Sequence, residues 1–331
     1  MRSLRVAIWL TGLSGCILPD ARPLTRFEYT ERYMATPCDI KLYAATAEEA
    51  ERAKTEAYAE IADIDAAMND WNPDSEISRL SATAGSGPWV PVSPRLFEVL
   101  RSGWAIAQLS DGAFDVTVGP IVKLWRQAKQ DQKLPSPEAL RTALAAVGWL
   151  HLQLDHARRT ALLEMPGMSP DVGGIAKGYA CDQALAVLAR HGITRAMVNT
   201  GGGMAFGDPP PGQSGWRIGL ADTDEVLVLS RCGVATSGDW ERFVVIDGKR
   251  YSHVVDPRTG LGLTNRALVT VVHPEGMVAD ALTKTVMVRG ADAGLKAIEN
   301  LPETHAWMRW EEDGRTRTAR TSGFDRLLLR N

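Results

Sequence analysis

The side chains of this chain that could do chemistry fall in a few short segments, and segment 251–260 (YSHVVDPRTG) contains the most distinctive histidine. A strand-like run there meets a turn with Pro and Gly, so His253 could be held beside a cleft as a general base. A purely structural histidine is the alternative interpretation of this pattern. None of the six histidines forms HxxH or HExxH, which argues against a zinc protease.

A second segment, 279–284 (ADALTK), combines a carboxylate, a hydroxyl and an ammonium. In a helix, Asp280, Thr283 and Lys284 share one face, so the first two could converge on a hard cation such as Mg²⁺. Lys284 complicates this interpretation. The alternative is a simple i,i+4 ion pair between Asp280 and Lys284.

Two glycine-rich segments could approach a ligand closely. Segment 171–179 (DVGGIAKGY) precedes a predicted helix, and its paired glycines and Lys177 are compatible with a phosphate site or with a plain turn. Segment 199–207 (NTGGGMAFG) superficially resembles a dinucleotide fingerprint, but Asp208 and three prolines follow in place of a helix. We therefore predict a tight turn there.

Composition excludes several classes of protein. The 331 residues are 45% hydrophobic and 23% charged, which is typical of a folded globular chain. With 37 basic and 40 acidic side chains the net charge is -3, so we expect no nucleic-acid partner. The sequence has neither a P-loop motif nor, after the first residues, a GxSxG elbow.

The first residues are typical of an export signal. Arg2 and Arg5 precede an apolar stretch that is too short to span a bilayer. The tetrapeptide LSGC ending at Cys16 looks like the lipobox of bacterial lipoproteins. We expect a signal peptide over residues 1–15, a lipidated Cys16, a tether over 16–26, and a membrane attachment through the lipid; a chance cysteine is the alternative.

Hydrophobic periodicity and capping residues predict helices over 46–69, 94–109, 137–147, 177–191, 276–288 and 291–299. Short strand-like runs lie between them, and several follow one another without a helix between residues 195 and 272. This order favours antiparallel or mixed sheets with packed helices over a doubly wound parallel sheet. The predicted fold class is α+β.

Taken in order, the motifs resemble those of the ApbE family of flavin transferases, over about residues 33–290. The family uses FAD to attach FMN to a Thr or Ser of a target protein. The segments that carry the resemblance are MAT (34–36), DSEISRL (74–80), GAFDVTVGP (112–120), 171–179, 199–203, VATSGD (234–239), 252–260 and 279–282.

The resemblance implies an ApbE-like fold over residues 27–331 with a flavin-binding cleft, and His253 as the base. It implies FAD as substrate, AMP as leaving group and Mg²⁺ held by Asp280, Thr283 and the Gly174 carbonyl. The FAD-contacting residues that it implies are Met34, Trp71, Ala113, Phe114, Asp115, Asp171, Lys177 and Val255.

The chain departs from the family pattern at four positions, which are Ala35, Trp71, Gly203 and Lys284. Lys284 stands where the family has a Thr near the metal, and an ammonium there would repel a divalent ion. A FAD-binding lipoprotein or a FAD pyrophosphatase with a weakened metal site is therefore the alternative function. By resemblance the acceptor is an exported protein, so we expect a periplasmic location, with the inner membrane as the expected anchor.

Overall fold

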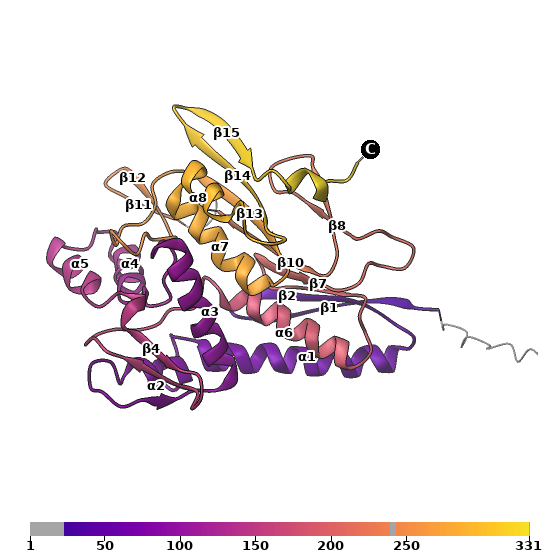
Figure 1. Ribbon diagram of the computed structural model, residues 1–331, viewed down its shortest axis with the longest axis horizontal. Coiled ribbons are helices and arrows are strands. Elements are labelled where there is room, and N and C mark those ends of the chain that lie inside the picture. Colours follow the sequence, from indigo (N-terminus) through magenta and orange to yellow (C-terminus); the bar gives the residue numbers. More distant parts are fainter. Residues whose placement is uncertain (1–22, 239–242, 331) are drawn as a thin grey trace, which may run out of the picture.

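The computed structural model describes residues 23–238 and 243–330, and its centre is an eight-stranded antiparallel sheet (Figure 1). The strand order is β1-β2-β6-β7-β10-β13-β14-β15. The bounds are β1 Thr25–Tyr33, β2 Thr36–Ala44, β6 Ala196–Asn199, β7 Gly203–Phe206, β10 Cys232–Gly238, β13 Ala267–His273, β14 His305–Glu312 and β15 Arg315–Arg320.

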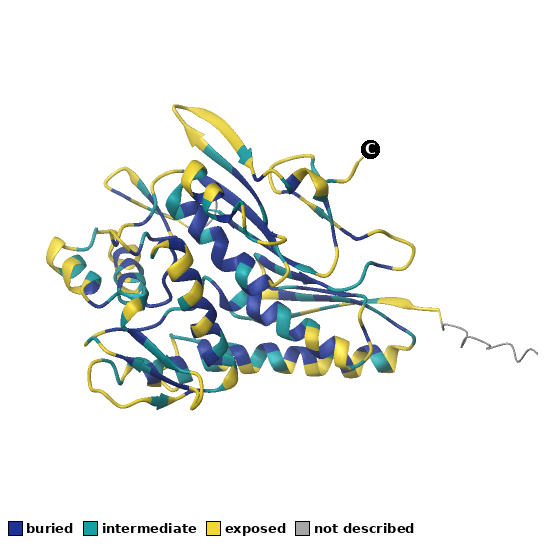
Figure 2. Ribbon diagram, viewed as in Figure 1, coloured by how far each residue is buried: buried dark blue, intermediate teal, exposed yellow. Residues whose placement is uncertain are grey.

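Helices cover one face of this sheet (Figure 1). They are α1 (Ala47–Met68), α6 (Ala176–Arg190), α7 (Gly276–Arg289) and α8 (Ala291–Ile298), and α3 (Pro94–Ser110) packs on α7. Thr46 begins α1 by accepting a hydrogen bond from the Glu49 amide, and the small and apolar residues at three-to-four spacing are buried. Figure 2 shows the buried stripe of these helices turned to the sheet.

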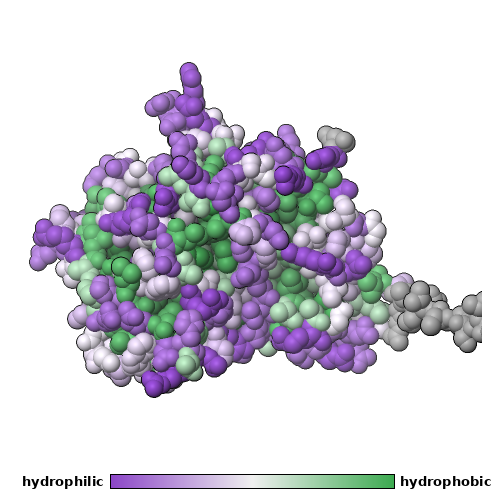
Figure 3. Space-filling view, in the orientation of Figure 1, coloured by the Kyte–Doolittle hydropathy of each residue, from purple (hydrophilic) through white to green (hydrophobic). Residues whose placement is uncertain are grey.

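The other face of the sheet is covered by the hairpin of β8 (Trp216–Gly219) and β9 (Val226–Leu229) with the short helix η2 (Phe324–Leu327). Strand β13 lies between the two layers, and six of its seven residues are buried. The β14–β15 hairpin projects from the body, and its tip is hydrophilic in Figure 3.

Smaller elements complete one end of the molecule. Helix α4 (Gly119–Asp131) and helix α5 (Pro137–Leu144) form a separate apolar cluster with the hairpin of β11 (Phe243–Ile246) and β12 (Lys249–Ser252). A three-stranded sheet of β3 (Val90–Pro91), β5 (Thr160–Leu163) and β4 (Leu152–Asp155) packs beside α2 (Glu76–Ser81), and η1 (Trp149–His151) precedes β4.

Close contact between α6 and α7 positions the residues that matter below. A Cβ on Gly178 would lie 2.1 Å from the Gly276 carbonyl oxygen, so only glycine allows this approach. Asp182 on α6 accepts hydrogen bonds from the Gly276 and Met277 amides, at 2.9 and 2.8 Å, and so caps the start of α7. One turn further along α7, Asp280 faces Gly178.

We expect Asp182 to make stability fall as pH rises. Burial raises the pKa of this carboxyl from 3.8 to about 7, against the lowering effect of the two amides. From about pH 4 to about pH 7 the unfolded chain releases a proton that the folded chain keeps, so the free energy of unfolding drops by up to about 1.4 kcal/mol per pH unit.

Urea unfolding of wild type and of Asp182→Asn from about pH 4 to about pH 8 checks this, because all other groups titrate alike in both. The free energy of unfolding of the wild type should fall relative to that of the variant up to about pH 7. Above about pH 7 the difference between the two proteins should stay constant. A difference that is constant with pH would show that Asp182 is ionised throughout.

The structure confirms the α+β class and all six predicted helices to within three residues at each end. It also corrects three expectations. Helices α2 and α4 lay outside the predicted set, and strand β1 begins at Thr25, two residues inside the predicted tether. The predicted signal peptide and Cys16 lie outside the described residues, and within the described ranges no helix is long and apolar enough to cross a membrane.

Candidate functional site

A single cavity of about 1040 Å³ collects residues that lie far apart in the chain. Its walls come from the segment after α3, helix α4, the segment before α6, the end of β10, and the chain from β12 onward, together with α7. This volume is at the upper end of the range for small-molecule sites. Ten predicted site residues line it: Ala113, Phe114, Asp115, Asp171, Gly174, Lys177, His253, Val255, Asp280 and Lys284.

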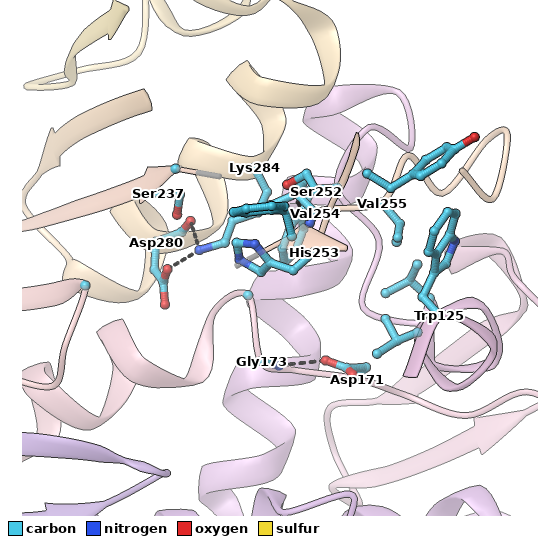
Figure 4. Close-up of a pocket in the computed structure, with 18 of the residues that line it drawn as sticks. Trp125, Asp171, Gly173, Ser237, Ser252, His253, Val254, Val255, Asp280 and Lys284 are labelled. Atoms are coloured by element: carbon cyan, nitrogen blue, oxygen red, sulfur yellow. Dashed lines mark hydrogen bonds and ion pairs between the residues drawn. The ribbon is translucent and has the colours of Figure 1, made fainter. Parts of the chain in front are cut away.

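His253 follows β12 and is exposed on the cavity wall (Figure 4). Its neighbours on both sides are fixed, because the Ser252 amide donates to the Leu263 carbonyl and the Leu263 amide donates to the Val254 carbonyl. The Ser252 hydroxyl also accepts from the Val254 amide at 3.1 Å. A rigid backbone therefore presents an accessible imidazole to the cavity.

Asp280 also lines the cavity and is almost completely buried, at 1% exposure. Its Oδ2 accepts a hydrogen bond of 3.2 Å from the Gly178 amide, and its Oδ1 forms an ion pair with the Lys284 ammonium. Lys284 Nζ also donates to the Asp280 carbonyl oxygen at 3.0 Å, as the dashed lines in Figure 4 indicate. The i,i+4 ion pair that the sequence allowed is therefore formed.

Thr283, the second predicted metal ligand, does not reach the cavity. It is fully buried, and its hydroxyl donates to the Asp280 carbonyl at 2.6 Å and hydrogen-bonds the Ser237 hydroxyl at 2.7 Å. The described residues contain no cluster of three or more His, Cys, Asp or Glu side chains that could hold a metal ion.

These residues do not fit a divalent cation as they are arranged. One oxygen of Asp280 faces an ammonium, the other faces an amide, and the Thr283 hydroxyl is directed to other partners. Two single charges at 4 Å repel by about 4 kcal/mol near a protein surface, and a divalent ion beside Lys284 doubles that repulsion. We therefore assign no chemical step to Mg²⁺.

Two more carboxylates line the cavity, and both are held by protein donors. Asp115 accepts from the amide and hydroxyl of Thr117, both at 2.7 Å, and from the Trp149 amide at 2.9 Å. Asp171 accepts from the Gly173 amide at 2.9 Å. Burial raises the pKa of each carboxyl, and nearby Asp70 adds to this for Asp171.

The paired glycines before α6 form the predicted turn. Lys177 bends back to donate to the Gly173 carbonyl at 3.1 Å, which leaves its ammonium on the cavity wall. In the other glycine-rich segment, the Thr200 amide donates to the Gly203 carbonyl and closes the predicted tight turn between β6 and β7. Gly201 and Gly202 of that turn, both at positive φ, also line the cavity.

Arg126 on α4 is a cavity residue that sequence analysis missed. Its guanidinium donates hydrogen bonds to Asp70 at 2.5 Å and to Asp171 at 3.2 Å, and so bridges the two carboxylates. The guanidinium carbon lies 4.2 Å from the centre of the Trp71 ring. Trp71 itself is 68% exposed and lies beside the cavity, not on its wall. The sequence did contain a signal for the start of α4, because Pro120 lies in its first turn and proline is favoured there.

We expect Arg126→Met to lower the free energy of unfolding by about 1.5–3 kcal/mol, because it leaves Asp70 and Asp171 facing each other without the cation between them. Urea unfolding measures the loss. Arg141→Met, which replaces an exposed arginine of α5, is the matched control and should change stability little. Equal effects of the two substitutions would show that the Arg126 contacts contribute nothing.

Met34 also lies outside the cavity wall. Its amide donates to Asp65 Oδ2 at 2.9 Å in a turn with positive φ between β1 and β2, and its side chain packs on the main core. Among the predicted FAD-contacting residues, Met34 and Trp71 are thus the two that the structure does not bring to the cavity.

Comparison with known proteins agrees with the motif order. The model of the ApbE family matches residues 34–308. The chain is 30% identical to the FAD:protein FMN transferase of Treponema pallidum, with 90% of each chain covered. It is 32% identical to that of Haemophilus influenzae, with 75% of this chain and 76% of that one covered.

Solved structures agree as well. The flavin transferase ApbE from Vibrio cholerae superposes with a TM-score of 0.83 at 29% identity, covering 92% of this chain and 100% of that one. The ApbE protein from Thermotoga maritima gives the same TM-score at 26% identity and the same coverage. Fold, cavity and motif order lead to one conclusion: this chain belongs to the ApbE family.

Proposed function

We propose that this protein is a FAD:protein FMN transferase that acts on a Thr or Ser hydroxyl of a partner protein. The observation that carries the proposal is that His253 and the Asp280–Lys284 pair lie on walls of one cavity, which also contains Asp115, Asp171 and Lys177. The relatives named FAD:protein FMN transferase align over most of the chain.

The reaction needs a base and positive charge near phosphate. The acceptor oxygen attacks the FMN-side phosphorus, the anhydride P–O bond breaks, and AMP leaves with the bonding electrons. His253 takes the hydroxyl proton, since its imidazole is accessible on a rigid backbone. Lys177 and Lys284 on the same cavity supply positive charge for the phosphoryl oxygens.

The test is transfer of flavin to protein. Full-length protein in mild detergent is incubated with FAD and an acceptor protein that carries a Thr-containing flavinylation sequence, and the gel is viewed for flavin fluorescence. The proposal expects a fluorescent acceptor band and one AMP per flavin attached. FAD that stays intact beside a folded acceptor would contradict it.

The Lys284–Asp280 pair favours a second candidate, which is a FAD-binding protein that hydrolyses FAD slowly to FMN and AMP. Water would then take the place of the acceptor hydroxyl in the same cavity. Free FMN that accumulates at equal rates with and without acceptor supports this candidate over the transferase.

The place of action is a further part of the proposal. The lipobox-like segment before Cys16 supports a lipid anchor, and we propose the periplasmic side of the inner membrane as the place, with exported proteins as acceptors. Growth of the expressing cells with a labelled fatty acid should label the wild-type protein and not Cys16→Ala. A wild-type protein that stays unlabelled would exclude the lipid anchor.

A further inference from the structure

Lys284 lies where the family resemblance expects a bound cation to neutralise the diphosphate of FAD. Its Nζ contacts both Asp280 Oδ1 and the Asp280 carbonyl oxygen. Its methylenes pass Gly174 closely, because a Cβ on Gly174 would lie 3.6 Å from Lys284 Cε and 3.8 Å from Cδ. The Lys284 side chain thus contacts Asp280 with its ammonium and passes Gly174 with its methylenes, and these are the two residues that the family resemblance assigned to a metal.

The surroundings hold this ammonium in place. Asp280 is almost completely buried and is itself oriented by the Gly178 amide, and the Lys284 side chain is 15% exposed. Gly178 cannot move freely, because its Cα lies against the start of α7. Lys284 also lines the cavity together with His253 (Figure 4). A positive charge is therefore fixed at the cavity wall by covalent attachment to α7.

We propose that Lys284 is a built-in cation for the FAD diphosphate, so that this chain binds FAD and transfers FMN without a divalent metal ion. The transfer step of this inference rests on the proposed function. The position of the positive charge rests on the ion pair between Lys284 and Asp280. Lys284 exchanges no proton and forms no bond to phosphorus; it offsets the negative charge of the phosphoryl oxygens. The hydroxyl proton still goes to His253 and AMP still leaves.

The first experiment measures FAD affinity of the wild-type protein by flavin fluorescence in EDTA and in millimolar Mg²⁺. Since Lys284 cannot dissociate, we expect the two dissociation constants to agree within about threefold. Tightening by more than that in Mg²⁺ would overturn the inference. This comparison needs no variant, so misfolding cannot obscure it.

Lys284→Thr should create the metal requirement that wild type lacks. Loss of a charge-assisted contact weakens FAD binding in EDTA by about 10–100-fold, and Mg²⁺ restores it because Asp280 is free to bind the ion. Lys284→Arg keeps the charge and should bind FAD in EDTA better than Lys284→Thr. Lys296→Thr on α8, an exposed lysine outside the cavity, is the matched control and should behave as wild type.

Thermal unfolding in EDTA and Mg²⁺ adds a readout that does not depend on FAD. Mg²⁺ should stabilise Lys284→Thr and leave wild type unchanged. Equal stabilisation of both proteins would overturn the inference, as would a Lys284→Thr variant that binds FAD in EDTA as tightly as wild type.

The transfer assay separates this inference from the proposed function. If wild type binds FAD in EDTA but never labels an acceptor, the built-in cation is supported and the transferase is not. If labelling occurs only with Mg²⁺, the transferase is supported and the built-in cation is overturned. Labelling in EDTA supports both.

Discussion

Replacing His253 with alanine lowers the rate of flavin transfer by about 10²–10⁴-fold while FAD stays bound. A hydroxyl is a weak nucleophile at neutral pH, and a base within hydrogen-bond reach contributes an acceleration of this size. The exposed imidazole on a backbone fixed from both sides is placed to do this, whereas Lys177 and Lys284, which we propose as the charges for the diphosphate, lie on α6 and α7. Single-turnover transfer and FAD titration measure the two effects separately.

His191→Ala is the matched control, because His191 lies at the C-terminal end of α6, outside the cavity, and pairs with Glu56. It should leave the transfer rate unchanged. Added imidazole should partly restore transfer in His253→Ala, since a small base can occupy the space that the side chain leaves. A His253→Ala protein that keeps more than about a tenth of the wild-type rate would rule out a general-base role.

Asp280→Asn lowers the free energy of unfolding by about 3–5 kcal/mol, because it removes the carboxylate that forms an ion pair with the Lys284 ammonium in a largely buried place. Asp280 is 1% exposed and the Lys284 side chain 15% exposed, so water compensates little. Urea unfolding at neutral pH gives the loss, and the lower end of the range is expected because the cavity admits some solvent to Lys284.

A double variant identifies the cause. Asp280→Asn with Lys284→Met removes both members of the ion pair and should recover most of the lost stability, since neither charge is then left without the other. If the double variant is less stable than Asp280→Asn alone, the loss comes from packing of α7 against α6 and β10 and not from breaking the ion pair.

Capping residues and hydrophobic periodicity predicted the helices and turns whose conformation depends on residues close by in the sequence. The capped, periodic helix beginning after Thr46 was predicted almost to the residue. The same local spacing allowed the Asp280–Lys284 pair, because residues four apart on a helix always face each other. Helix α4, whose buried residues include Ile121, Trp125 and Ala128, was missed because no capping side chain marks its start.

The predicted FAD-contacting residues differ in how far the sequence alone could place them. Resemblance predicts Trp71 and Met34 at the ligand; in the structure Trp71 packs against Arg126, which is 55 positions further along the chain, and Met34 packs on the core. Arg126 carries no motif, and its contacts with Asp70 and Asp171 form only once α4 has docked.

The sequence by itself determined six of the helices, the α+β class, the glycine turns and the presence of a histidine, carboxylates and lysines in family order. Only the tertiary structure decided that His253 and Asp280 face one cavity, that Thr283 turns away from it, and that Lys284 pairs with Asp280 on the cavity wall. The physical reason is that helix periodicity and turn chemistry act over a few residues. The direction of a side chain at the site depends instead on which distant backbone packs against it, as Gly178 does against Asp280.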